Sequence, residues 1–235
     1  MASPSFLIIG AQKCGTTSLY QYLIKHPTIS QAKRKEIHYF DVYYDKGTEW
    51  YEQQFSPLPK GHITGEATPR YLFHSKCPQR VYQYNPNMKL ILLLRDPIDR
   101  AFSNYQMDIR NKSEKLKKKH SSSFLSFEET LNTKKGNNYL LKGLYYSQLK
   151  QWLRYFPLHQ FHIIESNDFY QKTSEMMNLT FHFLGVKQTD SISYKVYHQG
   201  SYAPLNPSVR KKLSYYFKPY NEKLYQLIKR RFDWS

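Results

Sequence analysis

The chain has 235 residues, of which 40% are hydrophobic and 17% aromatic, which excludes a disordered chain and suits one domain with a sizeable core. Its 35 Lys and Arg residues outnumber its 18 Asp and Glu residues, so the formal net charge of +17 favours an anionic partner, with a merely soluble basic surface as the alternative. Two cysteines and no run of about 20 apolar residues exclude a disulfide scaffold, a cysteine-based metal cluster and a membrane span, and fit a reducing compartment.

The first predicted element is a short buried strand at residues 6–9, where the apolar run FLII ends at Gly10. Residues 17–25 follow with apolar side chains at helical spacing, and the pair His26-Pro27 stops that helix. A strand, a glycine-containing turn and a helix form the first half of a βαβ unit.

Two further apolar runs repeat this pattern of a strand and then a helix. Strand 89–94 (KLILLL) precedes a helix at 98–110, and strand 161–164 (FHII) precedes a helix at 175–184 that Gly185 caps. Apolar strands that alternate with helices predict an α/β fold, here a P-loop-like three-layer αβα arrangement around a mainly parallel sheet.

The remaining polar stretches are interpreted as surface. Residues 111–123 and 132–138 are expected to be loops on either side of a short helix at 124–131. With neither an internal repeat nor a linker, the whole chain, residues 1–235, is expected to form one domain.

The turn after the first strand, residues 10–18 (GAQKCGTTS), has the features of an anion-binding loop at the carboxyl end of a strand. Two glycines allow a sharp turn, the first helical N–H groups favour a negative charge, and Lys13 adds a cation. An ATP-binding P-loop has its lysine directly after the second glycine, whereas Lys13 lies in the middle of this loop. The loop therefore fits a shorter phosphate group better than a magnesium triphosphate; an ordinary turn with a chance lysine is the alternative.

A second candidate anion element follows strand 89–94. Arg95 ends the strand, Pro97 turns the chain, and Ser103 comes about two helical turns later. Arg95 and Ser103 can then converge on one ligand group, and an arginine binds phosphate bidentately. The alternative is that Arg95 and Asp96 pair with each other to cap the strand end.

Together, these two elements resemble the sulfotransferase superfamily, whose enzymes use 3′-phosphoadenosine 5′-phosphosulfate (PAPS). The forms K-x-G-T-[TS] and R-[DN]-P-x-x-R-x-x-S carry the resemblance. Further stretches are similar to the heparan sulfate 3-O- and N-sulfotransferase branch, and the likeness covers nearly the whole chain. These stretches are 35–41 (KEIHYFD), 65–71 (GEATPRY), 145–157 (YYSQLKQWLRYFP) and 232–234 (FDW).

The resemblance implies that PAPS is bound, that adenosine 3′,5′-bisphosphate is the product and that no metal is required. It assigns donor-binding roles to three groups of residues: Lys13, Cys14, Gly15, Thr16, Thr17 and Ser18 for the 5′-phosphosulfate, Arg95 and Ser103 for the 3′-phosphate, and Gly200, Ser201 and Tyr202 for a loop that closes over the nucleotide. Lys13 would lie near the bridging oxygen, where negative charge grows as the S–O bond breaks.

The catalytic roles implied by the resemblance are those of an in-line sulfuryl transfer. Glu36 would accept the proton of the acceptor hydroxyl or amine, and His38 would orient Glu36 or donate to the sulfonyl oxygens. If the segment is extended, residues two apart share a face, so both side chains reach one cleft. The alternatives are a surface glutamate paired with Lys33 or Lys35, and a partly buried structural histidine.

The chain also departs from the branch. Ala67 stands where the branch has a second lysine, and Arg70 is a candidate replacement or acceptor contact; Tyr39 and Tyr145 are further candidate acceptor contacts. The branch's cysteine pair and the K-G-R pattern of its nucleotide loop are missing. The lost pattern allows an acceptor other than heparan sulfate, and the missing cysteine pair suggests a cytoplasmic relative of bacterial type. The resemblance itself implies a carbohydrate acceptor, an anionic or neutral glycan.

Two other functions remain open from the sequence. A P-loop kinase or NTPase would need a Walker-B carboxylate, for which Asp96 is the candidate. A non-enzymatic binder of acidic polymers would need only the charge of +17. We expect no nucleic acid as the partner of the sulfotransferase.

Overall fold

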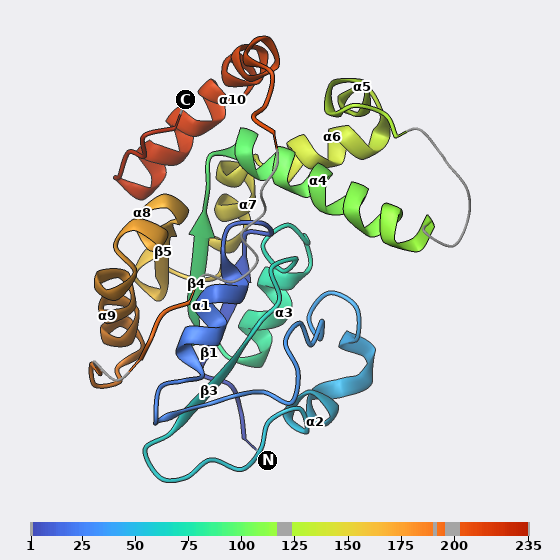
Figure 1. Cartoon of the computed structure of the whole chain (residues 1–235). Helices are drawn as coiled ribbons and strands as arrows, with labels where there is room; N and C mark the ends of the chain where they lie inside the picture. Colours follow the sequence, from blue (N-terminus) through green and yellow to red (C-terminus); the bar gives the residue numbers. More distant parts are fainter. Residues whose placement is uncertain (1, 117–123, 190–191, 196–202, 235) are drawn as a thin grey trace. The chain divides into compact units, whose positions relative to one another are not determined.

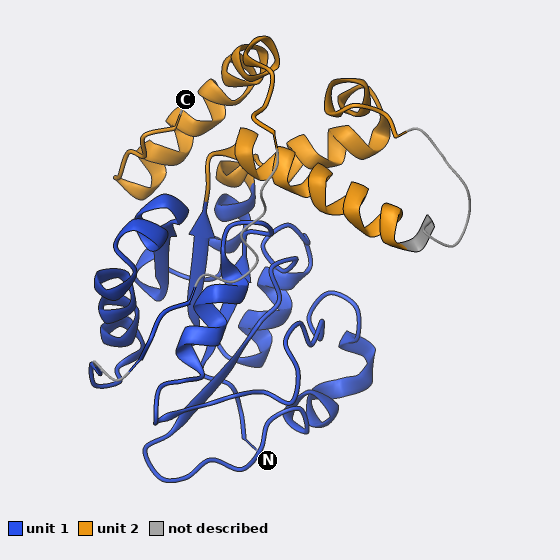
Figure 2. Ribbon diagram, in the orientation of Figure 1, with its two compact units in different colours: residues 1–94, 148–198 blue, residues 95–147, 199–235 orange. Residues whose placement is uncertain are grey.

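The computed structural model describes residues 2–116, 124–189, 192–195 and 203–234 of the chain. The chain divides into two compact units, shown in different colours in Figure 2. Unit 1 is formed by residues 1–94 and 148–198, and unit 2 by residues 95–147 and 199–235.

Unit 1 is built around a five-stranded sheet whose pairings are all parallel, with the strand order β2-β3-β1-β4-β5 (Figure 1). The strands are β1 (Phe6–Gly10), β2 (Ile29–Ser30), β3 (Ile63–Ala67), β4 (Lys89–Leu94) and β5 (Phe161–Glu165). Every residue of β1 is buried, which explains why this strand is an unbroken apolar run. The predicted α/β fold with a parallel sheet is confirmed.

Helices flank this sheet. Helix α1 (Thr16–Leu23) packs against β1 and β3, while α8 (Ser166–Gln171) and α9 (Thr173–Leu184) pack against β5. Gly185 caps α9 with a left-handed backbone, as predicted. The other helical segments are η1 (Tyr44–Lys46), α2 (Gly47–Glu52), α3 (Cys77–Tyr84), η2 (Leu158–Gln160) and α7 (Tyr145–Trp152), of which α7 begins within the residues of unit 2.

A cluster of aromatic rings supports the segment between β2 and β3. Tyr39 stacks on Tyr51 with ring centroids 4.4 Å apart, and Phe40 makes edge contacts with Tyr51, Tyr71 and Tyr84. Offset and edge-to-face ring pairs add to the stabilisation from burial itself. Part of the high tyrosine content of this chain is therefore structural.

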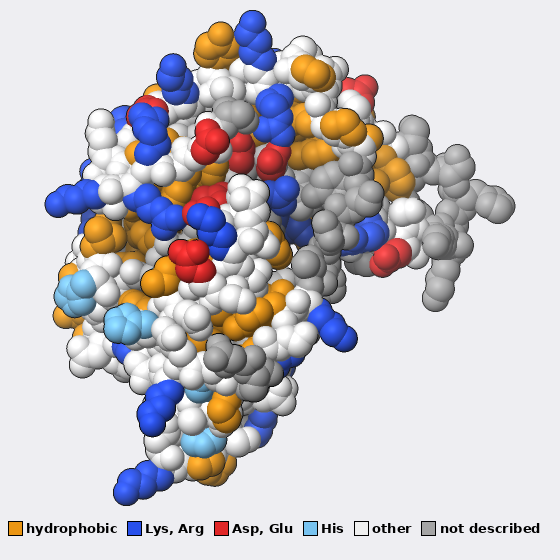
Figure 3. Space-filling model, turned by 60° about the vertical axis from the view of Figure 1, so that its left-hand side comes forward, with side chains coloured by type: hydrophobic (Ala, Val, Ile, Leu, Met, Phe, Trp, Pro, Cys, Tyr) orange, Lys and Arg blue, Asp and Glu red, His pale blue; other side chains and the backbone are white. Residues whose placement is uncertain are grey.

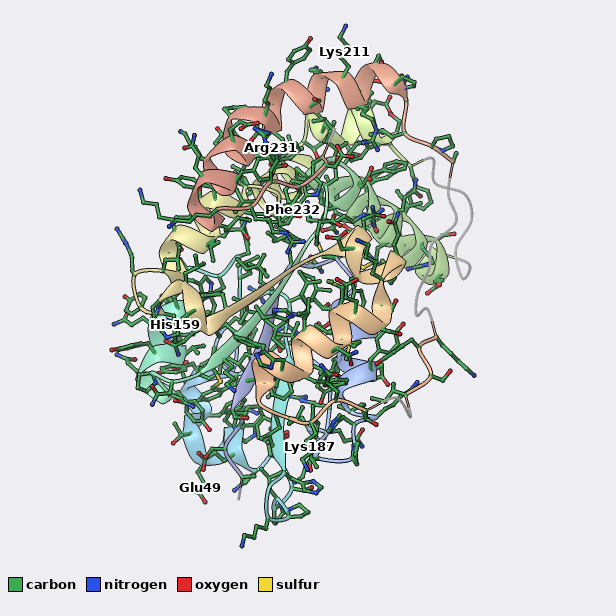
Figure 4. The ribbon with its side chains drawn as sticks, turned by 90° about the vertical axis from the view of Figure 1, so that its left-hand side faces the viewer. Glu49, His159, Lys187, Lys211, Arg231 and Phe232 are labelled. Carbon is green, nitrogen blue, oxygen red and sulfur yellow. The ribbon has the colours of Figure 1, made fainter. Side chains whose placement is uncertain are left out.

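Unit 2 is helical. Its helices are α4 (Pro97–Leu116), α5 (Phe127–Leu131), α6 (Lys134–Leu141) and α10 (Pro207–Ile228). They share one apolar core made of Ile98, Ala101, Phe127, Tyr139, Val209, Leu213 and Phe217. Within this unit, the buried ring of Phe232 contacts Tyr225 and Trp234, whereas Lys211 extends outward from α10 (Figure 4).

Two expected loops are wrong in part. Residues 134–141 form helix α6, and residues 111–116 continue α4, whereas residues 117–123 lie outside the described part of the chain. Thr133 caps α6 by accepting a hydrogen bond from Gly136 N, and Tyr139 is buried in the core of unit 2. Capping and the burial of one aromatic ring outweigh a polar sequence that by itself favours a loop.

On the face of the surface displayed in Figure 3, the distribution of charge does not by itself locate a binding site. Figure 3 shows Lys and Arg side chains spread across the displayed face, with hydrophobic side chains between them. Cys14 and Cys77 are both buried and form no disulfide with each other. None of the helices in the described ranges is long and apolar enough to cross a membrane.

Candidate functional site

The loop between β1 and α1 has a backbone that depends on glycine. Lys13 and Gly15 both have positive φ, 73° and 100°. A Cβ atom on Gly15 would meet the hydroxyl oxygen of Tyr170 at 2.8 Å, closer than real Cβ contacts allow. Gly15 therefore supplies both a left-handed turn and the space for a close approach.

Two hydrogen bonds fix this loop within unit 1. Ala11 N donates to Leu93 O of β4 at 2.7 Å, and the Ser166 hydroxyl at the start of α8 donates to Cys14 O at 2.9 Å. The Cys14 side chain is fully buried, so this residue can contribute to a ligand only through its backbone. The loop is thus held in place by two neighbouring elements.

The N-terminus of α1 fits an anionic group. In the described part of the chain no side chain caps this terminus, and its first turn contains no acidic residue. Uncapped N–H groups and the helix dipole then favour a phosphate. Lys13 and Thr17 are partly exposed there, whereas Thr16 and Ser18 are buried. The residues that the sequence assigned to the 5′-phosphosulfate are therefore compatible with that group.

The segment that carries Glu36 and His38 is not extended, contrary to expectation. Both residues have a left-handed backbone, with φ of 60° and 59°. Non-glycine residues adopt this conformation rarely, and such strain is concentrated at functional sites. The two side chains nevertheless approach each other, because His38 Nε2 lies 3.5 Å from Glu36 Oε2.

The carboxylate of Glu36 is accessible and paired. Its side chain is 44% exposed, so a solvent-borne acceptor can reach it. Lys35 Nζ donates to Glu36 Oε1 at 2.6 Å, which is the ion pair that the surface-glutamate alternative predicted. The contact with His38 goes beyond that alternative, since it joins Glu36 to a wider polar cluster.

Asp41 completes this cluster, and sequence reasoning gave it no role. Its side chain is fully buried, its carboxylate oxygens lie 3.0 and 3.1 Å from His38 Nδ1, and Arg70 Nε lies 3.5 Å from Oδ2. The contact arises because the chain turns after His38, whose carbonyl accepts hydrogen bonds from Val42 N and Tyr43 N. A carboxylate on one ring nitrogen fixes the orientation of an imidazole.

In unit 2, hydrogen bonds position the start of the second anion element, which runs from Arg95 to Ser103. Asp96 caps α4, since Oδ1 accepts from Ile98 N at 2.7 Å, and Arg210 Nη1 lies 3.8 Å from Oδ2. Tyr145 donates its hydroxyl proton to Arg95 O at 2.9 Å. A carboxylate used as a helix cap is a poor Walker-B ligand, which weakens the kinase alternative.

Several tentative assignments gain no support from the structure. Tyr39 and Tyr145 are each only 1% exposed, because their rings pack in the aromatic clusters, so neither offers a surface to an acceptor. Ala67 is buried at the end of β3, and Arg70, at 53% exposure, is a cation beside Asp41 of the cluster. The predicted nucleotide loop at residues 200–202 lies outside the described residues.

The likeness to known proteins extends over nearly the whole chain. The sulfotransferase domain family matches residues 3–213. The membrane-associated sulfotransferase kil1 of Dictyostelium discoideum is 30% identical over 99% of this chain and 66% of its own length. The mouse heparan sulfate glucosamine 3-O-sulfotransferase 5 is 30% identical over 98% of this chain and 74% of its own length.

The solved structures that resemble this chain are also sulfotransferases. A crystal structure of a sulfotransferase from Alicyclobacillus acidocaldarius superposes with a TM-score of 0.84 at 29% identity, covering 99% of this chain and 98% of that one. A sulfotransferase domain from the curacin biosynthetic pathway shares the fold, with a TM-score of 0.54, 12% identity, and coverage of 80% of this chain and 76% of that one. The protein belongs to the sulfotransferase domain family and is a PAPS-dependent sulfotransferase.

Proposed function

We propose that this sulfotransferase transfers the sulfuryl group of PAPS to a hydroxyl of an anionic glycan, with Glu36 as the general base. The observation that carries the proposal is the exposed Glu36 carboxylate, whose Oε2 lies 3.5 Å from the ring of His38. A general base must be accessible and held in one orientation, and this carboxylate meets both conditions.

The donor is assigned to the residues of the anion loop by their fit to a phosphate group. Lys13 and the first-turn N–H groups of α1 would hold the 5′ end, and the resemblance gives Arg95 and Ser103 to the 3′-phosphate. Lys13 would supply the positive charge that a metal supplies elsewhere, so the proposed reaction needs no metal. Donor binding thus uses backbone groups and cations of this chain alone.

In this proposal, Glu36 accepts the proton of the acceptor hydroxyl, and the side chains around it hold it in position. When bound, PAPS supplies an activated sulfuryl group: the acceptor oxygen bonds to sulfur as the sulfur–oxygen bond to the 5′-phosphate breaks, and the acceptor proton passes to Glu36. Asp41 holds the Nδ1 side of His38, which leaves Nε2 facing Glu36. His38 would therefore keep the base oriented while the proton is transferred.

The anionic character of the acceptor is inferred from Arg70. Its guanidinium lies beside Asp41, and its side chain is 53% exposed. A guanidinium binds carboxylates and sulfates bidentately, and acidic glycans carry these groups next to their hydroxyls. The net charge of +17 would assist the approach of such a chain. The similarity to the heparan sulfate glucosamine 3-O-sulfotransferase 5 points in the same direction.

Both units are proposed to act as one sulfotransferase domain. The family match runs from residue 3 to residue 213 and so includes residues of both units. The family match across residues of both units supports the proposal of a single functional domain over residues 1–235.

The experiment that tests this function is a transfer assay with isotopically labelled PAPS in the presence of EDTA. Acceptors are supplied in pairs, an acidic glycan and the same glycan with its carboxylates reduced or its sulfates removed. We expect labelled product from the acidic member and at least about tenfold less from its neutral counterpart, the scale of one lost charge-assisted contact. Equal labelling of both members would contradict an anionic acceptor.

The assignment of the anion loop to the donor predicts a preference among nucleotides. Adenosine 3′,5′-bisphosphate should raise the melting temperature by ligand linkage more than ATP with Mg²⁺ does. A larger shift with ATP and Mg²⁺ would contradict the donor site proposed for Lys13, Arg95 and Ser103. Binding of acidic glycans without any labelled product would contradict a glycan hydroxyl as the acceptor.

A further inference from the structure

The backbone of the Glu36–His38 segment is held by the end of strand β3. Glu36 N donates to Ala67 O at 3.1 Å, Ile37 N to Glu66 Oε2 at 3.4 Å, and His38 N to Thr68 Oγ1 at 3.4 Å. Three consecutive amides are therefore fixed to three consecutive residues. Two of these three bonds end on side chains, so they depend on the identity of the residues and not on the backbone alone.

The two side chains form one unit, here called the Glu66–Thr68 clamp. Thr68 donates its hydroxyl proton to Glu66 Oε2 at 2.6 Å, while Oε1 of the same carboxylate accepts from Tyr71 at 2.6 Å and Tyr51 at 3.3 Å. Glu66 and Thr68 are both fully buried. Each carboxylate oxygen thus accepts two hydrogen bonds, one pair towards the segment and one pair towards the aromatic cluster.

The left-handed backbone at Glu36 and His38 explains why the Glu66–Thr68 clamp is needed. Two left-handed non-glycine residues are strained, and they persist only where surrounding contacts hold them. Burial of Glu66 raises its pKa, while hydrogen bonds from Thr68, Tyr71, Ile37 and Tyr51 act in the opposite direction. Burial of a carboxylate at a strand end has an unfavourable desolvation free energy, which its hydrogen-bond donors must offset. Two of these donors connect it to the segment of Glu36 and His38, so the carboxylate can hold that segment in place.

We propose that Glu66 and Thr68 are positioning residues for sulfuryl transfer, which hold Glu36 and His38 in their left-handed backbone conformations. This inference rests on the proposed role of Glu36 as the base. Neither residue touches the reacting atoms; both act through the amides of Ile37 and His38.

The sharpest variant is Glu66→Gln. Glu66 Oε2 accepts from Ile37 N and Thr68, and Oε1 from the two tyrosines. A glutamine has one acceptor oxygen, so whichever way its amide turns, one pair of donors meets an NH₂ group. We expect kcat to fall by about tenfold or more, with Kd for adenosine 3′,5′-bisphosphate changed less than about twofold.

The second variant pair is Thr68→Val and Thr68→Ser. Valine keeps the shape of threonine and loses the hydroxyl, while serine keeps the hydroxyl that bridges His38 N and Glu66. The valine variant should lose turnover as the Glu66→Gln variant does, and the serine variant should retain most of it. Glu52→Gln is the matched control, because Glu52 accepts a bond from Tyr84 in the same aromatic cluster but none from residues 36–38.

Hydrogen exchange measured by NMR provides a readout that does not depend on activity. The amides of Ile37 and His38 should exchange about tenfold faster in Glu66→Gln and Thr68→Val than in the wild type, while amides of β1 remain as protected as before. Faster exchange supports the clamp even if Glu36→Gln proves active, an outcome that would refute only the proposed base. Unchanged exchange at both amides together with normal turnover in folded Glu66→Gln and Thr68→Val would overturn the inference.

Discussion

At the scale of single residues, the proposed site centres on a histidine between two carboxylates. His38 contacts Asp41 through Nδ1 and Glu36 through Nε2, and Asp41 is buried while Glu36 is exposed. The buried carboxylate can only orient the ring, whereas the exposed one can meet an acceptor. This difference in burial, and not the identity of the two acids, separates their roles.

The first prediction concerns Asp41→Asn. Asparagine retains the size of the side chain but loses the charge that holds the ring of His38, so kcat should fall by about tenfold or more with little change in donor affinity. Steady-state kinetics and calorimetric titration with adenosine 3′,5′-bisphosphate check this. Asp45→Asn, an exposed carboxylate in η1, is the control and should leave kcat unchanged. Equal effects of the two substitutions would show that Asp41 has no special role.

Sequence reasoning proposed Lys13, Glu36 and His38 because each lies in a short motif that resembles the family. It missed Asp41, because the contact with His38 depends on a turn that the polar and aromatic sequence of this segment does not reveal. It also expected an extended segment that places Glu36 and His38 on one face, and it separately named Tyr39 as a candidate acceptor contact. The left-handed residues at 36 and 38 break that alternation, and the Tyr39 ring packs on Tyr51 instead.

At the scale of elements, the strand–loop–helix unit from β1 to α1 was predictable and β3 was not. Buried parallel strands read as unbroken apolar runs, and β1 and β4 follow this rule. Strand β3 has the sequence ITGEA, and its glutamate is buried because four donors satisfy it. A buried acid with partners from distant positions is invisible to local periodicity.

The second prediction concerns the glycine of the anion loop. Gly15→Ala combines positive φ with a Cβ placed 2.8 Å from the Tyr170 hydroxyl, whereas Gly185→Ala, with a left-handed backbone at φ of 79°, places its Cβ at an ordinary 3.5 Å from Lys89 Nζ. Both should lose about 1 kcal/mol of unfolding free energy from backbone strain. Only Gly15→Ala should also weaken adenosine 3′,5′-bisphosphate binding. Urea unfolding and titration separate the two effects, and equal nucleotide affinity in both variants would exclude the loop from the donor site.

The third prediction concerns the contact between α4 and α6 in unit 2. Burial alone would raise the pKa of Asp108. Hydrogen bonds from Lys135 and Tyr139, together with the nearby positive charges, lower it by more, so the pKa is below its usual value. Its contribution to stability is therefore present at neutral pH and is lost as pH falls below the ordinary aspartate range, through the lowered pKa.

Asp108→Asn should accordingly destabilise the protein at neutral pH and matter less in acid. Urea unfolding of the wild type and the variant at about pH 7 and about pH 3 measures the difference. Glu128→Gln, at an exposed position in α5, serves as the comparison and should show no such pH trend. A difference between wild type and Asp108→Asn that grows towards acid would contradict the sign of this prediction.

At the scale of the whole molecule, the net charge favours an anionic partner but does not show where that partner binds. The net charge of +17 is spread over the displayed surface, and Arg210, part of a basic run, is engaged by Asp96 and Asp99 within unit 2. The acceptor contacts of this fold come from loops, whose sequences carry little regular pattern. Fold and donor were therefore accessible from sequence, while the proposed acceptor rests on the exposed guanidinium of Arg70 beside Asp41.

The most direct test of the central claim is single-turnover transfer from labelled PAPS by Glu36→Gln, in parallel with titration by adenosine 3′,5′-bisphosphate. Glutamine keeps the shape of Glu36 but cannot accept the acceptor proton. The rate of transfer should fall by about 100-fold or more, the usual scale of general-base catalysis, with Kd for the nucleotide changed less than about twofold. Transfer at the wild-type rate by this variant would contradict the assignment of Glu36 as the base.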